Sequence, residues 1–345
     1  MSGQVVVKLS PVNRLWVVFV LIILFLTSCQ DMSAPTLHRE SKFLMGTLVT
    51  VSIAGNKAAS AEACQAVINE ISRLEELTSF HRASSLNDIN NAAGKAAICV
   101  APELVSIIVH SITLAKQTNG AFDPTIGSVS RLWNFSGPRE PRVPSSEEIE
   151  HALALVGWQN VEVDEANNSV FLPRKGMALD LGGIVKAYAL GRAREVLKER
   201  KIESGLVDIG GDILALGQKV QDNKWRIGVK DPRRPFTVRG VIEVSDQFIL
   251  TSGDYERFLV QDGRRYHHII DPKTGYPAQG VRSVTLVTHD PLITAPAGVF
   301  VMGIERGLAF LEQLPAVYGW LIDDQDQVHE TQNARGLFKD TADAK

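Results

Sequence analysis

Two adjacent histidines near the C-terminus carry the side chains best suited to proton transfer. They lie in the run Tyr266-His267-His268-Ile269-Ile270-Asp271-Pro272. A neutral imidazole accepts a proton near neutral pH, so a histidine here can act as a general base. Successive side chains of a strand point to opposite faces, so at most one of the two enters a given site. Adjacency also makes them a poor chelating pair for a metal.

Glycine-bearing turns occur at three other places along the chain. They are Gly120–Gly127 (GAFDPTIG), Asp180–Lys186 (DLGGIVK) and Asp208–Asp212 (DIGGD). Paired glycines let backbone come close to a ligand, and a helix that starts there favours an anion at its N-terminus. Each turn alone is more often structural. Together with the histidines, the turns indicate a phosphate-binding site with a candidate histidine base.

The elements that position these residues follow from hydrophobic periodicity. Helices are expected over Ala58–Leu77, from Pro102 to near Thr118, after Ser145, after Gly183, and over Ile293–Leu314 with an interruption at Gly303. Strands are expected at Phe43–Ile53, Gly205–Ile209, Trp225–Val229, Val238–Val244, Gln247–Thr251, Arg265–Ile270, Arg282–Thr288 and Val317–Ile322. Tight turns between strand runs, mixed with helices, predict an α+β fold of mixed sheets with flanking helices in one large domain.

Composition excludes several classes of protein. Of the 345 residues 45% are hydrophobic and 22% charged, as in a folded globular protein. The net charge of −3 gives no general attraction for nucleic acid, and no nucleic-acid partner is expected. Three cysteines are too few for a disulfide scaffold, and no Cys-x-x-Cys pair suggests zinc. Cys64 and Cys99 either pair in an oxidising compartment or stay as free thiols, and the sequence does not decide between these.

The N-terminal residues are typical of an export signal. Lys8 and Arg14 precede an uninterrupted apolar stretch, Leu15–Leu26, that is shorter than the about 20 residues of a spanning helix. Leu26-Thr27-Ser28-Cys29 resembles a bacterial lipobox, which makes residues 1–28 a lipoprotein signal peptide and Cys29 the lipidated first residue. An uncleaved anchor is the alternative. We expect a tether over 29–40, a domain over 41–345, and a lipid-anchored location on the periplasmic face of the bacterial cell envelope.

Six segments, in order, resemble the FAD:protein FMN transferase family, the ApbE-type flavin transferase lipoproteins. They are Met45–Thr47, Phe122–Gly127 with Leu132–Phe135, Asp180–Lys186, Gly205–Gly217, Ser252–Phe258 and His268–Pro277. The resemblance covers about residues 41 to 325 and implies an ApbE-like fold. It also implies transfer of FMN from FAD, through a phosphoester bond, to a Thr or Ser of a target envelope flavoprotein. AMP is released and Mg²⁺ assists.

The same resemblance assigns roles to individual residues. It makes His268 the candidate base, with His267 serving the other face of the strand. The residues that it implies as FAD contacts are Met45, Phe80, Ala121, Phe122, Asp123, Asp180, Lys186 and Ile270. For Met45 and Phe80, ordinary core packing is the alternative.

One part of the family pattern is missing. The family carries an Asp and, four residues later, a Thr in a late helix, and these positions are Ile293 and Ala297 here. Neither side chain offers the oxygen that a hard cation requires. Only the backbone carbonyl at Gly183 remains from the usual metal set. Asp290 and Thr294 have the same spacing three residues earlier, so a shift of one helical turn is a second hypothesis for the metal site.

The missing ligands leave other functions open. One alternative is a flavin-binding accessory lipoprotein with impaired catalysis, and another is an FAD pyrophosphatase that releases FMN and AMP without an acceptor. A generic solute-binding lipoprotein is the least specific interpretation. FAD is thus expected as substrate in the leading hypotheses, whereas the Mg²⁺ site depends on the ligands at positions 293 and 297.

Overall fold

The computed structural model describes residues 36–137, 139–219 and 223–340. The expected signal peptide, Cys29 and residues 30–35 of the expected tether lie outside these ranges. Strand β1 (Thr36–Leu44) begins within the range 29–40 that was expected as a tether. Within the described ranges, no helix combines the length and apolar character needed to cross a bilayer.

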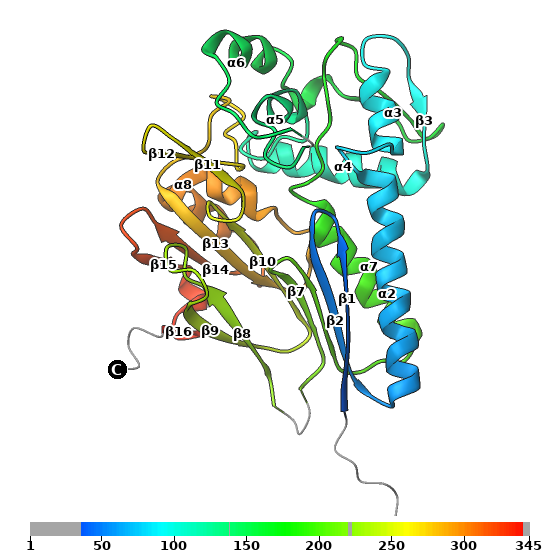
Figure 1. The fold of residues 1–345 in the computed structure, drawn as a ribbon, viewed down its shortest axis with the longest axis vertical. Coiled ribbons are helices and arrows are strands. Elements are labelled where there is room, and N and C mark those ends of the chain that lie inside the picture. The colour runs from blue at the N-terminus through cyan, green and yellow to red at the C-terminus, as the bar shows by residue number, and fades with distance from the viewer. Residues whose placement is uncertain (1–35, 138, 220–222, 341–345) are drawn as a thin grey trace, which may run out of the picture. The chain divides into compact units, whose positions relative to one another are not determined.

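An eight-stranded sheet organises the fold (Figure 1). Its strand order is β1-β2-β6-β7-β10-β13-β14-β15, and neighbours from β2 to β15 pair antiparallel. After β1, its strands are β2 (Thr47–Gly55), β6 (Gly205–Ile209), β7 (Asp212–Leu216), β10 (Gln247–Gly253), β13 (Val281–Thr288), β14 (Tyr318–Asp323) and β15 (Val328–Glu330). The α+β class predicted from the sequence is confirmed.

Three helices cover one face of this sheet. They are α2 (Lys57–Thr78), α7 (Val185–Glu199) and α8 (Pro296–Leu311). The Asn56 side chain caps α2, and apolar residues at helical spacing, such as Val67 and Ile71, are fully buried against the sheet. Helix α8 packs on β13 and β14 and is kinked at Gly303, whose φ of 80° is not helical. The interruption predicted at Gly303 is therefore confirmed.

A second, smaller sheet packs on the opposite face. Its order is β16-β9-β8, with β8 (Trp225–Lys230), β9 (Val238–Val244) and β16 (Phe338–Asp340). Trp225, Ile227 and Val229 of β8 are buried in the layer that also holds Ala215 and Ile249 of the main sheet. The neighbours of those two residues, such as Leu214 and Leu250, belong to the core on the helical face, so the main sheet is covered on both sides.

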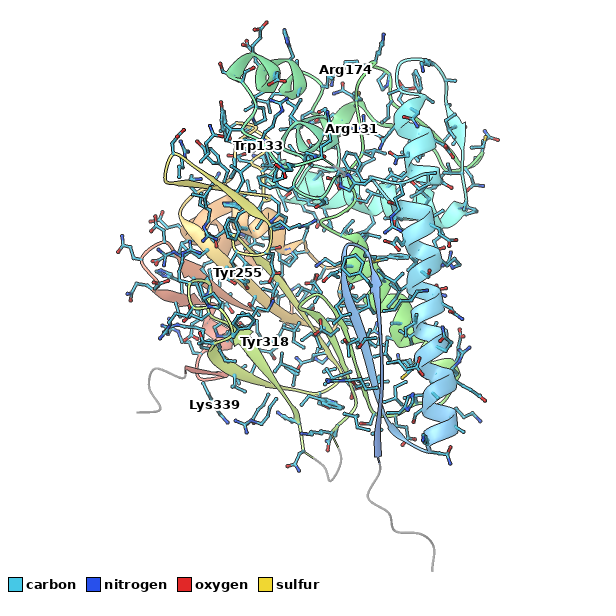
Figure 2. All side chains as sticks on the ribbon, in the orientation of Figure 1. Arg131, Trp133, Arg174, Tyr255, Tyr318 and Lys339 are labelled. Carbon is cyan, nitrogen blue, oxygen red and sulfur yellow. The ribbon has the colours of Figure 1, made fainter. Side chains whose placement is uncertain are left out.

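The remaining elements lie at one end of the sheet (Figures 1 and 2). They are α3 (Ser85–Asn91), α4 (Pro102–Gln117), α5 (Gly127–Trp133), α6 (Ser146–Leu153), the 3₁₀ turn Trp158–Asn160, strands β3 (Ile98–Cys99), β4 (Glu162–Asp164) and β5 (Ser169–Phe171), and the hairpin β11 (Phe258–Gln261) with β12 (Arg264–His267). A second 3₁₀ turn, Gln332–Ala334, lies instead beside β14, with Ala334 buried in the layer under the second sheet. Trp133 is fully buried and its indole N–H donates to the carbonyl of Gly275 at 2.9 Å. This contact ties α5 to the loop that follows His268.

Three predicted boundaries were wrong. The run Phe43–Ile53 is two strands, because Met45 and Gly46 have φ values of 52° and 72° and form a hairpin turn. Helix α8 begins at Pro296 rather than at Ile293. Strand β12 ends at His267, so the last residues of the predicted strand 265–270 lie in a loop. Turn chemistry and proline at a first helical turn decide these boundaries more strongly than periodicity.

Candidate active site

A cleft of about 750 Å³ lies where the end of the main sheet meets the helical region. This volume falls within the range of small-molecule sites, roughly 300–1,000 Å³. The sequence-predicted site residues that line it are Met45, Phe80, Ala121, Phe122, Asp123, Asp180, Gly183, Lys186, His268, Ile270 and Ala297. The fold therefore brings together all eight expected FAD contacts and the candidate base from five separate stretches of chain.

The turn before α7 brings backbone close to the cleft. An oxygen of Asp180 accepts the N–H of Gly182 at 2.9 Å, and the N–H of Asp180 donates to the carbonyl of Pro124 at 2.7 Å. A Cβ atom at Gly183 would lie 2.9 Å from the ring of Phe122, which is closer than real Cβ contacts. Glycine at 183 thus allows the Phe122 ring and the start of α7 to meet.

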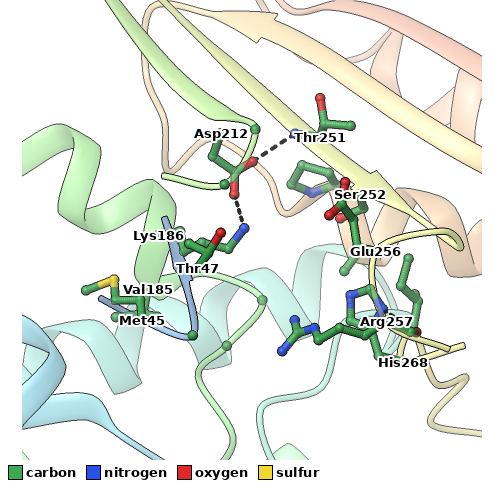
Figure 3. A pocket seen from close by; sticks show the side chains of 18 of the residues that line it. Met45, Thr47, Val185, Lys186, Asp212, Thr251, Ser252, Glu256, Arg257 and His268 are labelled. Atoms are coloured by element: carbon green, nitrogen blue, oxygen red, sulfur yellow. Dashed lines mark hydrogen bonds and ion pairs between the residues drawn. The ribbon is translucent and has the colours of Figure 1, made fainter. Parts of the chain in front are cut away.

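Lys186 and Asp212 form the central ion pair of the cleft (Figure 3). Lys186 Nζ lies 2.6 Å from Asp212 Oδ2, and Asp212 Oδ1 accepts the backbone N–H of Thr251 at 2.9 Å. Asp212 is 7% exposed, so the pair is shielded on the carboxylate side. The lysine stands in the first turn of α7, where the helix N-terminus adds to its positive potential. This arrangement suits a phosphate group.

Apolar and aromatic groups form the wall near the β1–β2 turn. The backbone N–H of Met45 donates to Glu75 Oε1 at 2.8 Å, which fixes the turn against the end of α2. Phe80 follows α2 directly, with the guanidinium of Arg131 5.1 Å from its ring centroid and His81 edge-on at 5.0 Å. Both Met45 and Phe80 are only partly buried and face the cleft, so they present free apolar surface there rather than core packing alone.

Asp123 holds two loops together. Its carboxylate accepts the backbone N–H and the hydroxyl of Thr125, at 2.8 and 2.6 Å, and the N–H of Trp158 at 3.3 Å. Burial raises the pKa of this carboxyl above its ordinary value, and the Thr125 hydrogen bonds oppose the rise. The Asp123 carboxylate therefore serves the shape of the cleft wall, and the residue lines the cleft beside Phe122.

The two histidines lie in different environments, as their adjacency predicted. His267 is buried, with Nε2 2.9 Å from the carbonyl of Ala278 and its ring 5.4 Å from that of Phe300. His268 lines the cleft, and its backbone N–H donates to the carbonyl of Arg257 at 3.1 Å.

The surroundings of His268 keep its imidazole neutral. Burial, and then the positive charge of Arg257, hold the pKa of His268 well below its ordinary 6.5. Its Nδ1 lies 3.3 Å from the carbonyl oxygen of Arg257. A proton on Nδ1 donates to that carbonyl and leaves Nε2 unprotonated, which is the form a general base requires.

The sequence did not single out Arg257 and Asp212 as site residues. Arg257 lines the cleft, and its guanidinium hydrogen-bonds to the hydroxyl of Ser136. Arg257 lies in the Ser252–Phe258 segment, which was used only for the resemblance, and Asp212 ends the glycine turn Asp208–Asp212, which was considered for its backbone rather than for this carboxylate. An acidic residue directly after a glycine turn, facing a lysine from another turn, is the signal that could have identified Asp212.

The residues expected at the metal site do not fit a hard cation. Ala297 lies beside Gly183, with its Cβ 3.9 Å from the position of a Cβ at Gly183, but it contributes only a methyl group. Ile293 does not line the cleft and packs on the core beneath α8. In the described part of the chain, no three His, Cys, Asp or Glu side chains gather closely enough to hold a metal ion.

The shifted pair, Asp290 and Thr294, stands outside the cleft. Asp290 is exposed and its carboxylate accepts the N–H of Leu292 at 2.9 Å. Thr294 is 2% exposed, and neither residue lines the cleft. Because α8 begins only at Pro296, their spacing of four does not place them on one helical face.

The two remaining cysteines do not pair. Cys64 is buried under β2, and Cys99 is exposed in β3; both are free thiols. Burial raises the pKa of Cys64 to about 11, so its thiol is protonated and unreactive at neutral pH. The question that the sequence left open is settled in favour of free thiols.

Comparison with known proteins gives consistent matches. The ApbE family model matches residues 45–320. An FAD:protein FMN transferase of Klebsiella pneumoniae is 35% identical, covering 82% of this chain and 88% of that protein. One of Treponema pallidum is 32% identical, covering 87% and 88%. The crystal structure of the ApbE protein of Thermotoga maritima superposes with a TM-score of 0.82 at 34% identity, covering 88% of this chain and 99% of the other.

Proposed function

The chain belongs to the ApbE family and is an FAD:protein FMN transferase, and we propose that the cleft holding Lys186 and His268 is its catalytic site. The observation that carries the proposal is convergence. Eight expected FAD contacts and the expected base, scattered over more than 220 positions of sequence, line one cavity of suitable volume. Chance placement of structural turns does not produce such a grouping.

The reaction transfers the FMN group of FAD through its phosphate. A hydroxyl oxygen of a Ser or Thr in the acceptor protein attacks the phosphorus atom of the FMN half of FAD. The bond between that phosphorus and the bridging oxygen breaks, and AMP leaves with the bridging oxygen and its electron pair. The hydroxyl proton passes to Nε2 of His268, which the Arg257 carbonyl and the local charge keep unprotonated beforehand.

Positioning and charge account for the rest of the catalysis. The pyrophosphate is negatively charged, and phosphoryl transfer depends on holding it in place and stabilising that charge. Lys186 and the N-terminus of α7 supply the positive potential, and glycine backbone at 182–183 allows close approach. Because the residues at 183, 293 and 297 do not fit Mg²⁺, we assign no step to a metal.

We further propose that the protein is a lipid-anchored envelope protein acting on a flavoprotein in the same compartment. The support is the apolar stretch 15–26 followed by the lipobox that ends in Cys29. Expression of the full chain with radiolabelled palmitate should label the wild type in the membrane fraction. A Cys29→Ala variant should carry no label, and equal labelling of both chains would contradict the anchor.

The activity is tested with the full chain, FAD and the acceptor protein of the Klebsiella pneumoniae relative. The expected product is an acceptor that carries flavin fluorescence after denaturing electrophoresis, with one AMP released per label. AMP without a labelled acceptor would instead identify an FAD pyrophosphatase. Flavin binding with neither AMP nor label, tested across several divalent cations, would reject catalysis and favour an accessory flavin-binding role.

A further inference from the structure

Strand β8 borders the cleft with its backbone edge. Four consecutive residues, Ile227 to Lys230, line the cleft wall. Successive side chains of a strand point to opposite faces of its sheet. A cavity on one face therefore meets every second residue, whereas a cavity along the strand's edge meets four consecutive residues. Among the strands at sheet edges within residues 36–340, as described, β8 alone contributes such a run.

This edge is available for pairing. Strand β8 ends the order β16-β9-β8, and in the described residues its backbone ladder is with β9 only. Trp225, Ile227 and Val229 are buried toward the main sheet, while Gly228 is exposed and has no side chain to shield the backbone. A free strand edge presents N–H and C=O groups that bind a further extended chain.

The C-terminal end of β8 is linked by side-chain and backbone contacts to the segment that carries the candidate base. Lys230 Nζ donates to Glu256 Oε1 at 2.9 Å. The next residue, Arg257, accepts the backbone N–H of His268 at 3.1 Å. Two short contacts thus connect the end of the free edge to the residue expected to remove the proton, and Glu256, Arg257 and His268 lie on the same side of the cleft in Figure 3.

The cleft wall next to β8 is built from elements other than those that carry the expected FAD contacts. Leu48 and Thr50 of β2 and Asp208 of β6 also line the cleft, and Thr50 and Asp208 are paired across the ladder. None of the eight expected FAD contacts lies on β2, β6 or β8. We call this wall, formed by β2, β6 and β8, the second part of the cleft; it adjoins the first part, because the charges of both Lys186 and Lys230 act on Asp208.

We propose that the acceptor protein enters this second part as an extended segment, which adds as a strand to the free edge of β8 and so delivers its Ser or Thr hydroxyl to His268. The inference rests on the proposed function, because it names how the second substrate of that reaction binds. Main-chain hydrogen bonds to the edge hold the segment whatever most of its side chains are. Only the side chain that reaches His268 must be a hydroxyl.

Hydrogen exchange tests the proposal directly. The full chain with His268→Ala, loaded with FAD, cannot complete transfer and is mixed with the acceptor protein of the Klebsiella pneumoniae relative. Acceptor binding should slow amide exchange in the peptide covering 225–230, whereas FAD alone should not. Protection by FAD alone would show that the flavin occupies this part. Labelled acceptor made by the wild type, without protection of 225–230, would overturn strand addition while leaving the proposed function intact.

Proline substitutions give a second test. Neighbouring N–H groups of a strand point to opposite edges, so one of Gly228→Pro and Val229→Pro removes an outward N–H and keeps pairing with β9. The variant that retains FAD affinity should show a KM for the acceptor raised about tenfold, with kcat within about twofold. Arg226→Ala is the matched control, because it truncates a 70% exposed side chain and keeps the backbone. An effect of Arg226→Ala equal to that of proline would indicate side-chain docking and reject the proposal.

Discussion

The two sides of the cleft around the start of α7 differ in the chemistry they retain. Toward β7 and β10, Lys186 and Asp212 form an ion pair, and His268 stands on the cleft wall hydrogen-bonded to the carbonyl of Arg257. Toward α8, Gly183 faces the methyl group of Ala297, and Ile293 packs away from the cleft. The first side has what proton removal and phosphate binding require, and the second lacks oxygen ligands for a cation.

The difference shows which functions of the site are separable. A general base such as His268 and a positively charged side chain such as Lys186 each act through their own side chain. Their roles therefore do not depend on a neighbouring metal ligand. A divalent cation, in contrast, needs several oxygens at once, and two apolar replacements are enough to remove the set. Under the proposed function, Lys186 and the N-terminus of α7 stabilise the charge of the pyrophosphate, so we expect turnover to depend on the Lys186 side of the cleft.

Replacing the base should have the largest effect. His268→Ala removes the only imidazole on the cleft wall apart from His81, and the transfer rate should fall by about 10²–10⁴. FAD affinity should stay within about threefold, since the phosphate-facing groups are untouched. Labelled acceptor per minute and FAD titration give the two values. His81→Ala is the control, and a larger loss there than at His268 would move the base to the other wall.

The dependence of the transfer rate on pH tests the role of His268 without a mutation. Burial and Arg257 hold the pKa of His268 well below 6.5, so its imidazole stays unprotonated as pH falls through that value. The transfer rate should therefore remain level from about pH 8 to below 6.5 and decline only when His268 is finally protonated. Initial rates at saturating FAD measure this. A half-maximal rate at 6.5 would mean that the imidazole titrates as if exposed, which contradicts the observed surroundings.

The sequence predicted the elements well where pattern and turn chemistry agree. Helix α2 and strands β6, β8 and β9 lie close to their expected positions, because their burial repeats with the expected period, and β13 does so as a strand buried on both faces. The β1–β2 turn was missed because Leu44, Met45 and Leu48 continue an apolar run, and only the positive φ at Met45 and Gly46 breaks it. Local propensity does not reveal such a turn when the flanking residues are all good strand formers.

The site was predictable only in part, for a physical reason. The glycine turns and the histidines could be recognised in the sequence as a candidate phosphate site and a candidate base. The family resemblance connected them, and in the structure they line one cleft. The Lys186–Asp212 contact and the free edge of β8 arise from pairing between segments distant in sequence. Partners of that kind depend on register and sheet order, which a single sequence does not specify.

Removing the positive charge of Lys186 should weaken FAD binding and have the next-largest effect. Lys186→Met eliminates a charge-assisted contact and should raise the Kd for FAD about 10- to 100-fold. It also leaves the carboxylate of Asp212, which is 7% exposed, without its partner, so Tm should fall. The double variant with Asp212→Asn separates the two effects: it should recover most of the Tm but not the affinity. Recovery of both would mean that Lys186 acts only through the fold.

The smallest expected effect is that of removing divalent cations, and it probes the other side of the cleft. With Ala297 and Ile293 in place of oxygen ligands, the Kd for FAD in EDTA should stay within about twofold of its value with Mg²⁺. Ala297→Asp should make FAD affinity rise with Mg²⁺, since that side chain supplies oxygens next to Gly183. Asp290→Ala, at a residue outside the cleft, is the control and should not change the response. A tenfold loss of FAD affinity in EDTA for the unaltered protein would show that other oxygens hold a cation here. The two sides of the cleft would then differ in which residues bind the cation, and not in whether a cation is needed.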